Sequence, residues 1–297
     1  MKKIGFVGLG TMGLPIATNL VNAGYQLYVG FNRNRNPAEL MEKKGAVICN
    51  TYKEVAQNSD VIFTVVPNAN EVEQVVFGKD GLVEGIKPGS IIMDMSTIDL
   101  TRSREFAERL KEKGALFMDA PVSGGPEGAS AATLAIMVGG DKQAFEDSRE
   151  ILNSVGKTVV YCGSNGLGLA AKMANNLIAG AEMAAIAEAV CLAAKAGINT
   201  KDLYEILRNA SANSAVLNAK MPKYLEENYD PSFKLSLMYK DLNIITDVGK
   251  KLGSPTPVAS MVEQIFGMCN KEHGEKDSGA VALFYQKQAG ITFKAKS

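Results

Sequence analysis

The sequence has very few of the residues that bind metal ions. Its 297 residues include one histidine, His273, and four cysteines, none of which stands in a C-x-x-C pair. Because a structural zinc site needs clustered cysteine and histidine ligands, we expect no metal site. Widely spaced cysteines are typical of ordinary buried thiols in a reducing compartment.

An excess of either charge is also missing. The sequence has 32 basic and 32 acidic residues, so its formal net charge is zero, and it contains no run of five basic residues. Without a field of one sign, neither nucleic acid nor an anionic membrane is an expected partner. An anionic ligand must therefore be held by a local site.

We expect neither a targeting segment nor a membrane span. Met1-Lys2-Lys3 leads directly into a short strand that ends in glycines, which leaves no room for a signal peptide. The most apolar stretch, residues 177–194, is half alanine or glycine and is interrupted by Glu182 and Glu188. That composition suits a buried helix better than a bilayer span, so we expect a cytoplasmic protein.

Two hydrophobic patterns divide the chain. Residues 4–163 alternate short β-branched runs with helical segments, which predicts an α/β Rossmann domain with a mostly parallel, doubly wound sheet. From residue 166 onward, long helical periods rich in alanine, methionine and leucine predict an all-α domain. The turn-rich segment 163–166 marks the boundary, so the predicted domains are 1–163, for dinucleotide binding, and 164–297, for substrate binding and oligomerisation. Strands are expected at 4–7, 26–31, 61–66, 91–95, 116–120, 135–138 and 158–161, and helices at 11–23, 70–77, 101–113, 142–154, 166–196, 200–211, 235–252, 256–270 and 278–289.

A glycine motif follows the first predicted strand and opens the first helix. It reads Gly8-Leu9-Gly10-Thr11-Met12-Gly13, a G-x-G-x-x-G in the context that a dinucleotide site requires. Gly8 allows a tight turn, Gly10 lets backbone amides approach a pyrophosphate, and Gly13 lets the helix pack on the strand. The helix N-terminus then offers unpaired N–H groups to the phosphates.

The residues after the second strand favour NADP(H), with NAD(H) as the alternative. An acid at this position would bind the ribose 2′-hydroxyl of NAD, but the sequence reads Asn32-Arg33-Asn34-Arg35, with no acid before Glu39. Guanidinium groups of Arg33 and Arg35 are suited to a 2′-phosphate. The alternative is that both arginines are solvated loop residues.

Four separated motifs, in their order and spacing, resemble those of the β-hydroxyacid dehydrogenase family, the group of 3-hydroxyisobutyrate dehydrogenase, tartronate semialdehyde reductase and glyoxylate/succinic semialdehyde reductase. Two departures from the family pattern, Ile16 for methionine and Ala132 for glycine, are interpreted as changes at packing positions. An extra residue around Gly30-Phe31 leaves open which of Asn32 and Arg33 faces the ribose. The motifs are Phe6-Val7-Gly8-Leu9-Gly10-Thr11-Met12-Gly13, Asp119-Ala120-Pro121-Val122-Ser123-Gly124-Gly125, Gly166-Leu167-Gly168-Leu169-Ala170-Ala171-Lys172-Met173-Ala174-Asn175-Asn176 and Lys240-Asp241-Leu242.

The resemblance places Lys172 at the family's catalytic position. A lysine partly desolvated at a domain junction has a lowered pKa and can exchange a proton with the substrate oxygen. Asn175 and Asn176 lie three and four residues further on the same helix face, where an amide can orient the ammonium group or the substrate. Spacing alone favours a different interpretation, an exposed lysine beside two asparagines.

Further site residues are implied for substrate and cofactor. Ser123-Gly124-Gly125 follows a strand at the ligand-binding edge of the sheet, where a hydroxyl and two glycine amides form a concavity for a carboxylate; a glycine turn without a ligand is the alternative. The resemblance also implies that Val66-Pro67, Thr97 and Lys240 contact the cofactor and that Phe233 walls the substrate pocket, although spacing alone makes Phe233 a core residue.

These observations predict an NADPH-preferring reductase of a short, carboxylate-bearing semialdehyde or 2-oxo acid, of the glyoxylate, succinic semialdehyde or tartronate semialdehyde type, with Lys172 as general acid and base. An NAD-linked 3-hydroxyisobutyrate-type dehydrogenase is the alternative within the family. A non-catalytic dinucleotide sensor or scaffold on the same fold is the alternative from another class, and a decarboxylating sugar-acid dehydrogenase would need more basic residues in 120–176. The alanine-rich helices suggest a homodimer or homotetramer.

Overall fold

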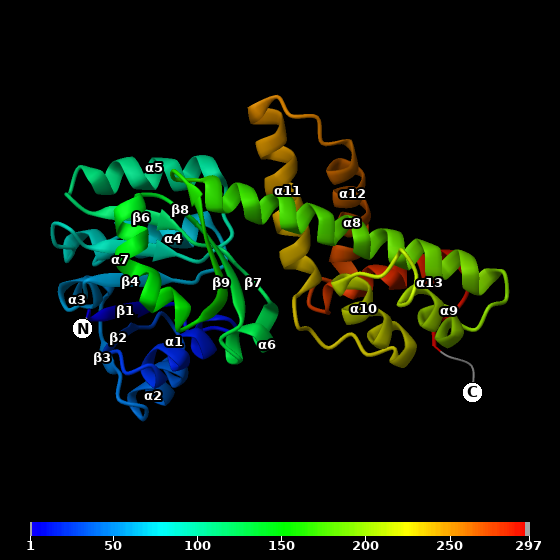
Figure 1. The fold of residues 1–297 in the computed structure, drawn as a ribbon, viewed down its shortest axis with the longest axis horizontal. Coiled ribbons are helices and arrows are strands. Elements are labelled where there is room, and N and C mark those ends of the chain that lie inside the picture. Colours follow the sequence, from blue (N-terminus) through cyan, green and yellow to red (C-terminus); the bar gives the residue numbers. More distant parts are fainter. Residues whose placement is uncertain (1, 295–297) are drawn as a thin grey trace. The chain divides into compact units, whose positions relative to one another are not determined.

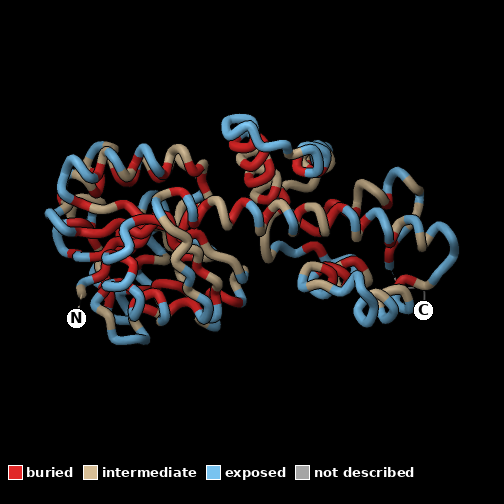
Figure 2. The backbone as a smooth tube through the Cα atoms, turned by 45° about the horizontal axis from the view of Figure 1, so that its top comes forward, coloured by how far each residue is buried: buried red, intermediate tan, exposed pale blue. Residues whose placement is uncertain are grey.

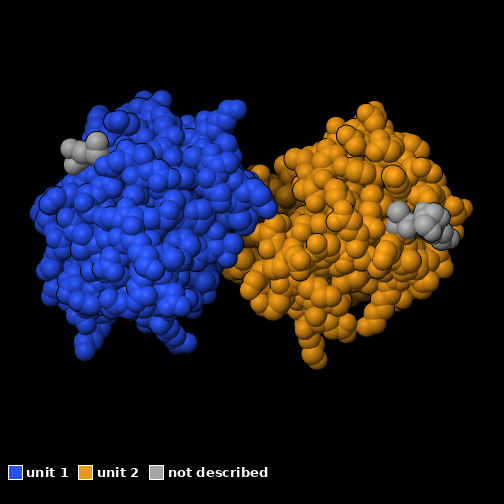
Figure 3. Space-filling view, turned by 90° about the horizontal axis from the view of Figure 1, so that it is seen from below, with its two compact units in different colours: residues 1–172 blue, residues 173–297 orange. Residues whose placement is uncertain are grey.

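The chain folds into two compact units. The computed structural model describes residues 2–294, and the units comprise residues 1–172 and 173–297 (Figure 3). They meet within one long helix, α8 (Leu167–Lys195), whereas the sequence places the boundary at 163/164. The difference arises because the first turn of α8 is hydrogen-bonded to a strand of unit 1.

Unit 1 is built on one nine-stranded sheet, whose strands lie in the order β3-β2-β1-β4-β5-β6-β8-β7, with β9 paired to β8 (Figure 1). All neighbours from β3 to β6 are parallel, whereas β8 runs antiparallel to β6 and to β7. The predicted fold class is therefore confirmed. The strands are β1 (Ile4–Val7), β2 (Leu27–Gly30), β3 (Val47–Cys49), β4 (Val61–Thr64), β5 (Ile91–Asp94), β6 (Leu116–Asp119), β7 (Val122–Ser123), β8 (Leu134–Gly139) and β9 (Gly156–Gly163).

Helices and loops connect these strands, and the sequence did not predict the shortest strands or the shortest helices of this unit. Strands β3 and β7 have only three and two residues, and α2, α3 and α6 have six or seven, too few for a visible hydrophobic period. The helices of unit 1 are α1 (Gly13–Asn22), α2 (Asn36–Glu42), α3 (Tyr52–Gln57), α4 (Ala69–Phe77), the 3₁₀ helix η1 (Leu82–Glu84), α5 (Leu100–Lys111), α6 (Gly125–Ser130) and α7 (Lys142–Asn153).

The core of unit 1 lies along the central strands. Every residue of β1, β4 and β5 is buried. Figure 2 shows that buried segments gather in the interior of this unit. Strands that are apolar on both faces are the pattern of a covered parallel sheet. Ile16 packs fully buried in this core, as predicted. The prediction for Ala132 was wrong, because its backbone lies in the left-handed region at φ 56°, so glycine is favoured there by conformation rather than by packing.

Unit 2 is helical over its described residues, as predicted. Helices α11 and α12 pack side by side (Figure 1). Helix α10 was not predicted, because Pro222 and polar residues interrupt its apolar period. Besides the end of α8, the helices are α9 (Thr200–Leu207), α10 (Ala215–Glu226), α11 (Leu235–Leu252), α12 (Pro257–His273), the 3₁₀ helix η2 (Ser278–Val281) and α13 (Ala282–Ala289).

Helix α8 is less buried than its composition predicts. It is the one helix among the described residues that is long and apolar enough, by length and composition, to cross a membrane, and 28% of its most apolar window is buried. Ile178 and Leu192 are 59% and 74% exposed. The expectation of a buried helix is therefore met only in part, on the face that carries Leu169, Met173, Met183, Ala187 and Val190.

Candidate functional site

The glycine motif makes the turn that the sequence predicts between β1 and α1. Gly8 has φ 101°, and a Cβ atom there would lie 2.1 Å from the carbonyl oxygen of Val65. A Cβ on Gly13 would lie 1.8 Å from the Gly8 carbonyl oxygen. By contrast, a Cβ on Gly10 would meet nothing within 4 Å. Gly8 and Gly13 therefore close the turn against the protein, while Gly10 leaves space in front of it.

A cavity of about 390 Å³ opens at this turn. Gly8, Leu9 and Gly10 line one wall, and Val66 and Pro67, predicted to contact the cofactor, line another. Open space at Gly10, beside the N-terminus of α1, fits the pyrophosphate of a dinucleotide. The cavity is lined by Val7, Gly8, Leu9, Gly10, Gly30, Phe31, Asn32, Arg33, Asn34, Pro37, Tyr52, Val65, Val66, Pro67, Glu71, Gln74 and Val75.

The residues after β2 divide in their placement. Asn32 and Arg33 both line the cavity, so the extra residue in this loop removes neither from it. Arg35 does not line it. Its guanidinium lies 3.3 Å from the Glu39 carboxylate and 5.2 Å from the ring centroid of Phe31. Of the two arginines, therefore, only Arg33 lines the cavity.

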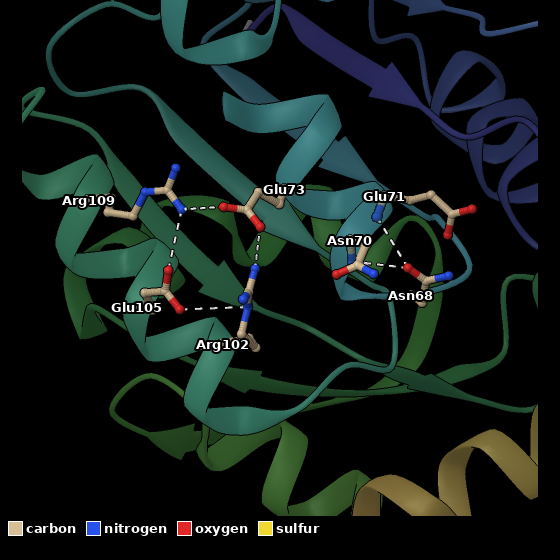
Figure 4. Close-up of polar contacts among 7 residues, drawn as sticks. All are labelled: Asn68, Asn70, Glu71, Glu73, Arg102, Glu105 and Arg109. Atoms are coloured by element: carbon tan, nitrogen blue, oxygen red, sulfur yellow. Dashed lines mark hydrogen bonds and ion pairs between the residues drawn. The ribbon is translucent and has the colours of Figure 1, made fainter. Parts of the chain in front are cut away.

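Sequence reasoning missed an acid in this cavity. Glu71 enters the cavity from the first turn of α4, which Asn68 caps by accepting hydrogen bonds from the N–H groups of Asn70 and Glu71 (Figure 4). Its carboxylate oxygen Oε2 is buried and has no hydrogen-bond partner. This acid lies far in sequence from the position after β2 where an acid would bind the ribose of NAD. It is a candidate acceptor for an amino or hydroxyl group of an adenosine.

The neighbouring Glu73 has a structural role. It pairs with Arg109 at 2.8 Å and with Arg102, and Arg109 also lies 3.7 Å from the ring centroid of Phe77 (Figure 4). The hydrogen bonds from Arg109 and Arg102 hold the pKa of Glu73 below its usual value. These contacts tie α4 to α5 on the surface of unit 1.

Asp94, at the end of β5, organises the loops beside the cavity. Its Oδ1 accepts hydrogen bonds from the hydroxyls of Thr64 at 2.7 Å and Ser96 at 2.6 Å, and from the Ser96 N–H at 3.2 Å. The Ser96 hydroxyl in turn accepts the N–H of Val66 at 2.9 Å. Burial raises the pKa of Asp94 to about 6. Thr97, predicted to lie near the nicotinamide ribose, is the residue after Ser96.

Asp119, at the end of β6, holds the start of α8. Its Oδ1 accepts the Gly166 N–H at 2.7 Å, and its Oδ2 accepts the Leu169 N–H at 3.0 Å. The side chain is fully buried, and burial raises its pKa despite these hydrogen bonds. Lys172, one turn beyond Leu169, is itself buried at 8% exposure.

The predicted substrate loop begins four residues after Asp119. Ser123 ends β7 and is half-buried, and Gly124 and Gly125 have φ of 135° and 65°, which other residues rarely adopt. The loop therefore has the two glycines because its backbone requires them, and it presents a hydroxyl beside them.

In unit 2, the predicted residues form a chain of polar contacts. Asn175 donates its amide to Asn176 Oδ1 at 2.9 Å, and Asn176 donates to Asp241 Oδ2 at 2.7 Å. Lys240 lies 3.1 Å from Asp241 Oδ1. Asn176 and Asp241 are buried, at 4% and 3% exposure. Asp241 was part of a recognised motif but had no predicted role, and the structure makes it the link between Asn176 and Lys240.

Phe233 is half-buried at the loop before α11, so the structure does not place it fully in a core. Its N–H donates to Asp277 Oδ2 at 3.4 Å, and its carbonyl accepts the N–H of Ser278 at 2.8 Å. The backbone on which this ring is mounted is thus fixed by a buried carboxylate.

Comparison with known protein families covers almost the whole chain. Residues 3–163 match the family described as the NAD binding domain of 6-phosphogluconate dehydrogenase. Residues 166–285 match the family described as NAD-binding of NADP-dependent 3-hydroxyisobutyrate dehydrogenase. Both halves therefore resemble parts of nicotinamide-dependent enzymes.

Individual relatives are similar over their full length. 2-(Hydroxymethyl)glutarate dehydrogenase of Eubacterium barkeri is 38% identical over 292 residues, 98% of this chain and 97% of that protein. 2-Hydroxy-3-oxopropionate reductase of Escherichia coli is 36% identical over 275 residues, 92% of this chain and 93% of that protein. The solved structure of Mycobacterium tuberculosis 3-hydroxyisobutyrate dehydrogenase with L-serine has a TM-score of 0.88 at 32% identity, covering 96% of this chain and 99% of that one.

Proposed function

Because the chain belongs to the β-hydroxyacid dehydrogenase family and is thus an NAD(P)-dependent oxidoreductase, we propose that it reduces a short semialdehyde or 2-oxo acid to the hydroxy acid. The observation that carries the proposal is the burial of Lys172, at 8% exposure, on a helix whose first turn is anchored to Asp119, four residues before Ser123. The position of Lys172 matches the catalytic position of the family.

In this mechanism Lys172 gives a proton to the carbonyl oxygen of the substrate, and its positive charge stabilises the oxyanion as it forms. A nicotinamide dinucleotide held at the cavity that Gly8, Gly10 and Val66 line would supply the hydride for the carbonyl carbon. The Ser123 hydroxyl and the amides of Gly124 and Gly125 bind the substrate carboxylate and thereby orient the carbonyl. Asn176, on the next turn of the same helix, orients the Lys172 ammonium group or the substrate.

The cofactor proposal is NADPH, with NADH as the alternative. Arg33 on the cavity wall supports a 2′-phosphate, and the absence of an acid after β2 agrees with it. Glu71 in the same cavity opposes it, because a carboxylate repels a phosphate and binds a hydroxyl. The preference between NADPH and NADH is therefore set by which of Arg33 and Glu71 faces the ribose.

Steady-state rates of the full chain test reaction, cofactor and substrate together. We expect a higher kcat/KM with NADPH than with NADH, and a higher kcat/KM for succinic semialdehyde than for butanal, which has the same length but no carboxylate. Arg33→Ala should reduce kcat/KM for NADPH selectively, and Glu71→Gln should change it in the opposite direction. Equal use of both cofactors would overturn the NADPH proposal, and equal use of both aldehydes would overturn the carboxylate anchor. Oxidation of 3-hydroxyisobutyrate with NAD as the fastest reaction would favour the alternative activity.

We also propose that the protein works as a homo-oligomer in the cytoplasm. The exposed apolar residues of α8, among them Ile178 and Leu192, support a second copy as its cover, because monomeric proteins rarely expose large apolar patches. The four cysteines form no disulfide in the structure, which supports a reducing compartment.

A further inference from the structure

Two buried carboxylates stand side by side where the parallel strands of unit 1 end. Asp94 is the last residue of β5 and Asp119 the last residue of β6, and the two residues are direct partners in the strand register. Both have no exposed surface. Ligands of open parallel sheets bind at this edge, so both acids are placed next to the functional loops.

Asp119 uses both of its oxygens on the helix that carries Lys172. Oδ1 accepts from Gly166 and Oδ2 from Leu169, which are N–H groups that a helix leaves unsatisfied at its start. The Ser103 hydroxyl adds a longer contact to Oδ1 at 3.3 Å. An aspartate that accepts hydrogen bonds from two backbone N–H groups at once fixes the rotation of the helix as well as its position.

The neighbouring glycines show that space is kept clear for this arrangement. A Cβ on Gly139 would lie 2.7 Å from Asp119 Oδ2. A Cβ on Gly168 would lie 2.3 Å from the Met137 carbonyl oxygen and 2.9 Å from Asp119 Oδ2. The close approach of α8 to β6 and β8 therefore depends on both glycines and on the carboxylate between them.

Asp94 uses its oxygens differently. All three of its hydrogen bonds reach Oδ1, whereas Oδ2 is buried without a partner. Through the Ser96 hydroxyl, Asp94 holds the Val66 amide on the cofactor cavity. The two acids thus support different segments, one on the cofactor side and one on the catalytic side.

We propose that Asp119 is a positioning residue that sets the reactive position of Lys172 through the first turn of α8, while Asp94 has the corresponding role for the cofactor loop. The inference rests on the proposed role of Lys172. In this proposal Asp119 contacts neither substrate nor cofactor, and it acts through the N–H groups of Gly166 and Leu169. An asparagine at this position has one acceptor oxygen in place of two, so one of the amides loses its acceptor and faces an N–H₂ group.

The test is a double-mutant cycle with Asp119→Asn and Lys172→Ala, combined with cofactor titration. Lys172→Ala should lower kcat by about 10²–10⁴-fold. Asp119→Asn should lower kcat by about 10-fold or more, with little change in KM or in the Kd for NADPH measured by fluorescence. In the Lys172→Ala background, Asp119→Asn should have almost no further effect on kcat, because both changes act on the same proton transfer. Hydrogen exchange at Gly166 and Leu169 should be faster in Asp119→Asn.

Matched controls separate this role from general destabilisation. Asp141 caps α7 in the same unit by accepting the Ala144 N–H at 2.8 Å, so Asp141→Asn makes the same chemical change at a different helix start. It should leave kcat unchanged. Asp94→Ala should raise the Kd for NADPH more than it lowers kcat. If Asp119→Asn does not fold, Ser103→Ala provides a milder change, with an expected loss in kcat of two- to threefold.

Several results would overturn the inference. Faster exchange at Gly166 and Leu169 with unchanged kcat would show that the anchor is structural only. Full additivity of Asp119→Asn and Lys172→Ala would show that Asp119 acts on something other than Lys172. Unchanged kcat in Lys172→Ala would instead remove the proposed proton donor, which is a failure of the proposed function and is recognised by that single variant.

Discussion

Asp119 in unit 1 and Asp277 in unit 2 are both fully buried carboxylates that fix backbone amides, but their charges are compensated in different ways. Asp119 has only amides and a hydroxyl as partners. Asp277 has amides, a hydroxyl and a cation, since Lys220 Nζ lies 2.6 Å from its Oδ1. Burial raises the pKa of Asp119. At Asp277 burial acts in the same direction, but Lys220 together with the hydrogen bonds from Gly279 and Ser232 outweighs it, so the pKa of Asp277 is lowered.

The difference indicates where the fold accepts an unfavourable charge. In unit 2 the acid holds the loop before α11, and its charge is compensated by Lys220, with Lys223 at 3.9 Å. At the edge of the unit 1 sheet, two adjacent acids are buried with no cation among their hydrogen-bond partners. Such a site costs stability and is retained at functional positions, where activity and stability oppose one another. The comparison therefore agrees with the positioning role inferred for Asp119.

Removing the cation from unit 2 should have the largest effect on stability. Lys220→Met removes the closer of the two lysines that pair with Asp277, and loss of one partner of a buried pair costs about 3–5 kcal/mol. The midpoint of urea denaturation should fall accordingly. Lys223→Met is the matched control, because Lys223 lies further from Asp277, at 3.9 Å, and is more exposed, so its loss should cost much less. Equal, small losses in both variants would show that Asp277 does not depend on its cation.

The contributions of Asp94 in unit 1 and Asp277 in unit 2 to stability should also depend on pH with opposite signs. The pKa of Asp94 is about 6 in the folded protein against 3.8 as its ordinary value, so the folded state binds the proton more tightly. Stability should therefore fall as the pH rises from about 4 to 6, by up to about 3 kcal/mol, and stay level above that. The lowered pKa of Asp277 has the opposite consequence: its contribution is present above pH 3.8 and is lost as the pH falls through the lower, folded value.

Asp94→Asn isolates the first of these effects. The asparagine oxygen can still accept the three hydrogen bonds that now reach Oδ1, so the loops stay in place while the titration disappears. The free energy of unfolding, measured between pH 4 and 7, should be flatter for Asp94→Asn than for the parent chain. The same slope in both proteins would show that another group causes it.

Prediction from the sequence succeeded where a signal is local. The strands of unit 1 are continuous apolar runs, and the glycine motif stands between a strand and a helix, so the parallel sheet and the dinucleotide turn were both predicted. The contacts that organise the site are not local. Asp119 binds amides 47 and 50 residues away, and Glu71 reaches the cavity from a helix outside the usual motif. No spacing rule within one chain connects such residues.

The resemblance to a family helped with residue identity and less with conformation. It placed Lys172 and Asn176 at functional positions, and the structure finds both buried. It also marked Ala132 as a departure, but gave no reason why glycine is usual there. The reason is a left-handed backbone, which sequence patterns show only when glycine is present.

Ala132 offers the smallest expected effect and a comparison between the two units. Ala132 in unit 1 and Glu227 in unit 2 have nearly the same backbone conformation, with φ of 56° and 55°. A left-handed residue other than glycine costs about 1–2 kcal/mol of stability. Replacing it with glycine removes this cost, but the greater freedom of glycine in the unfolded chain offsets about 0.5–1 kcal/mol of the gain. Ala132→Gly should therefore stabilise the protein by about 0.5–1 kcal/mol.

Glu227→Gly relieves the same strain but removes the carboxylate that accepts the Thr292 hydroxyl, so its net effect should be close to zero. Urea denaturation of both variants measures the difference, and a destabilised Ala132→Gly would show that the alanine methyl group contributes packing that outweighs its backbone strain.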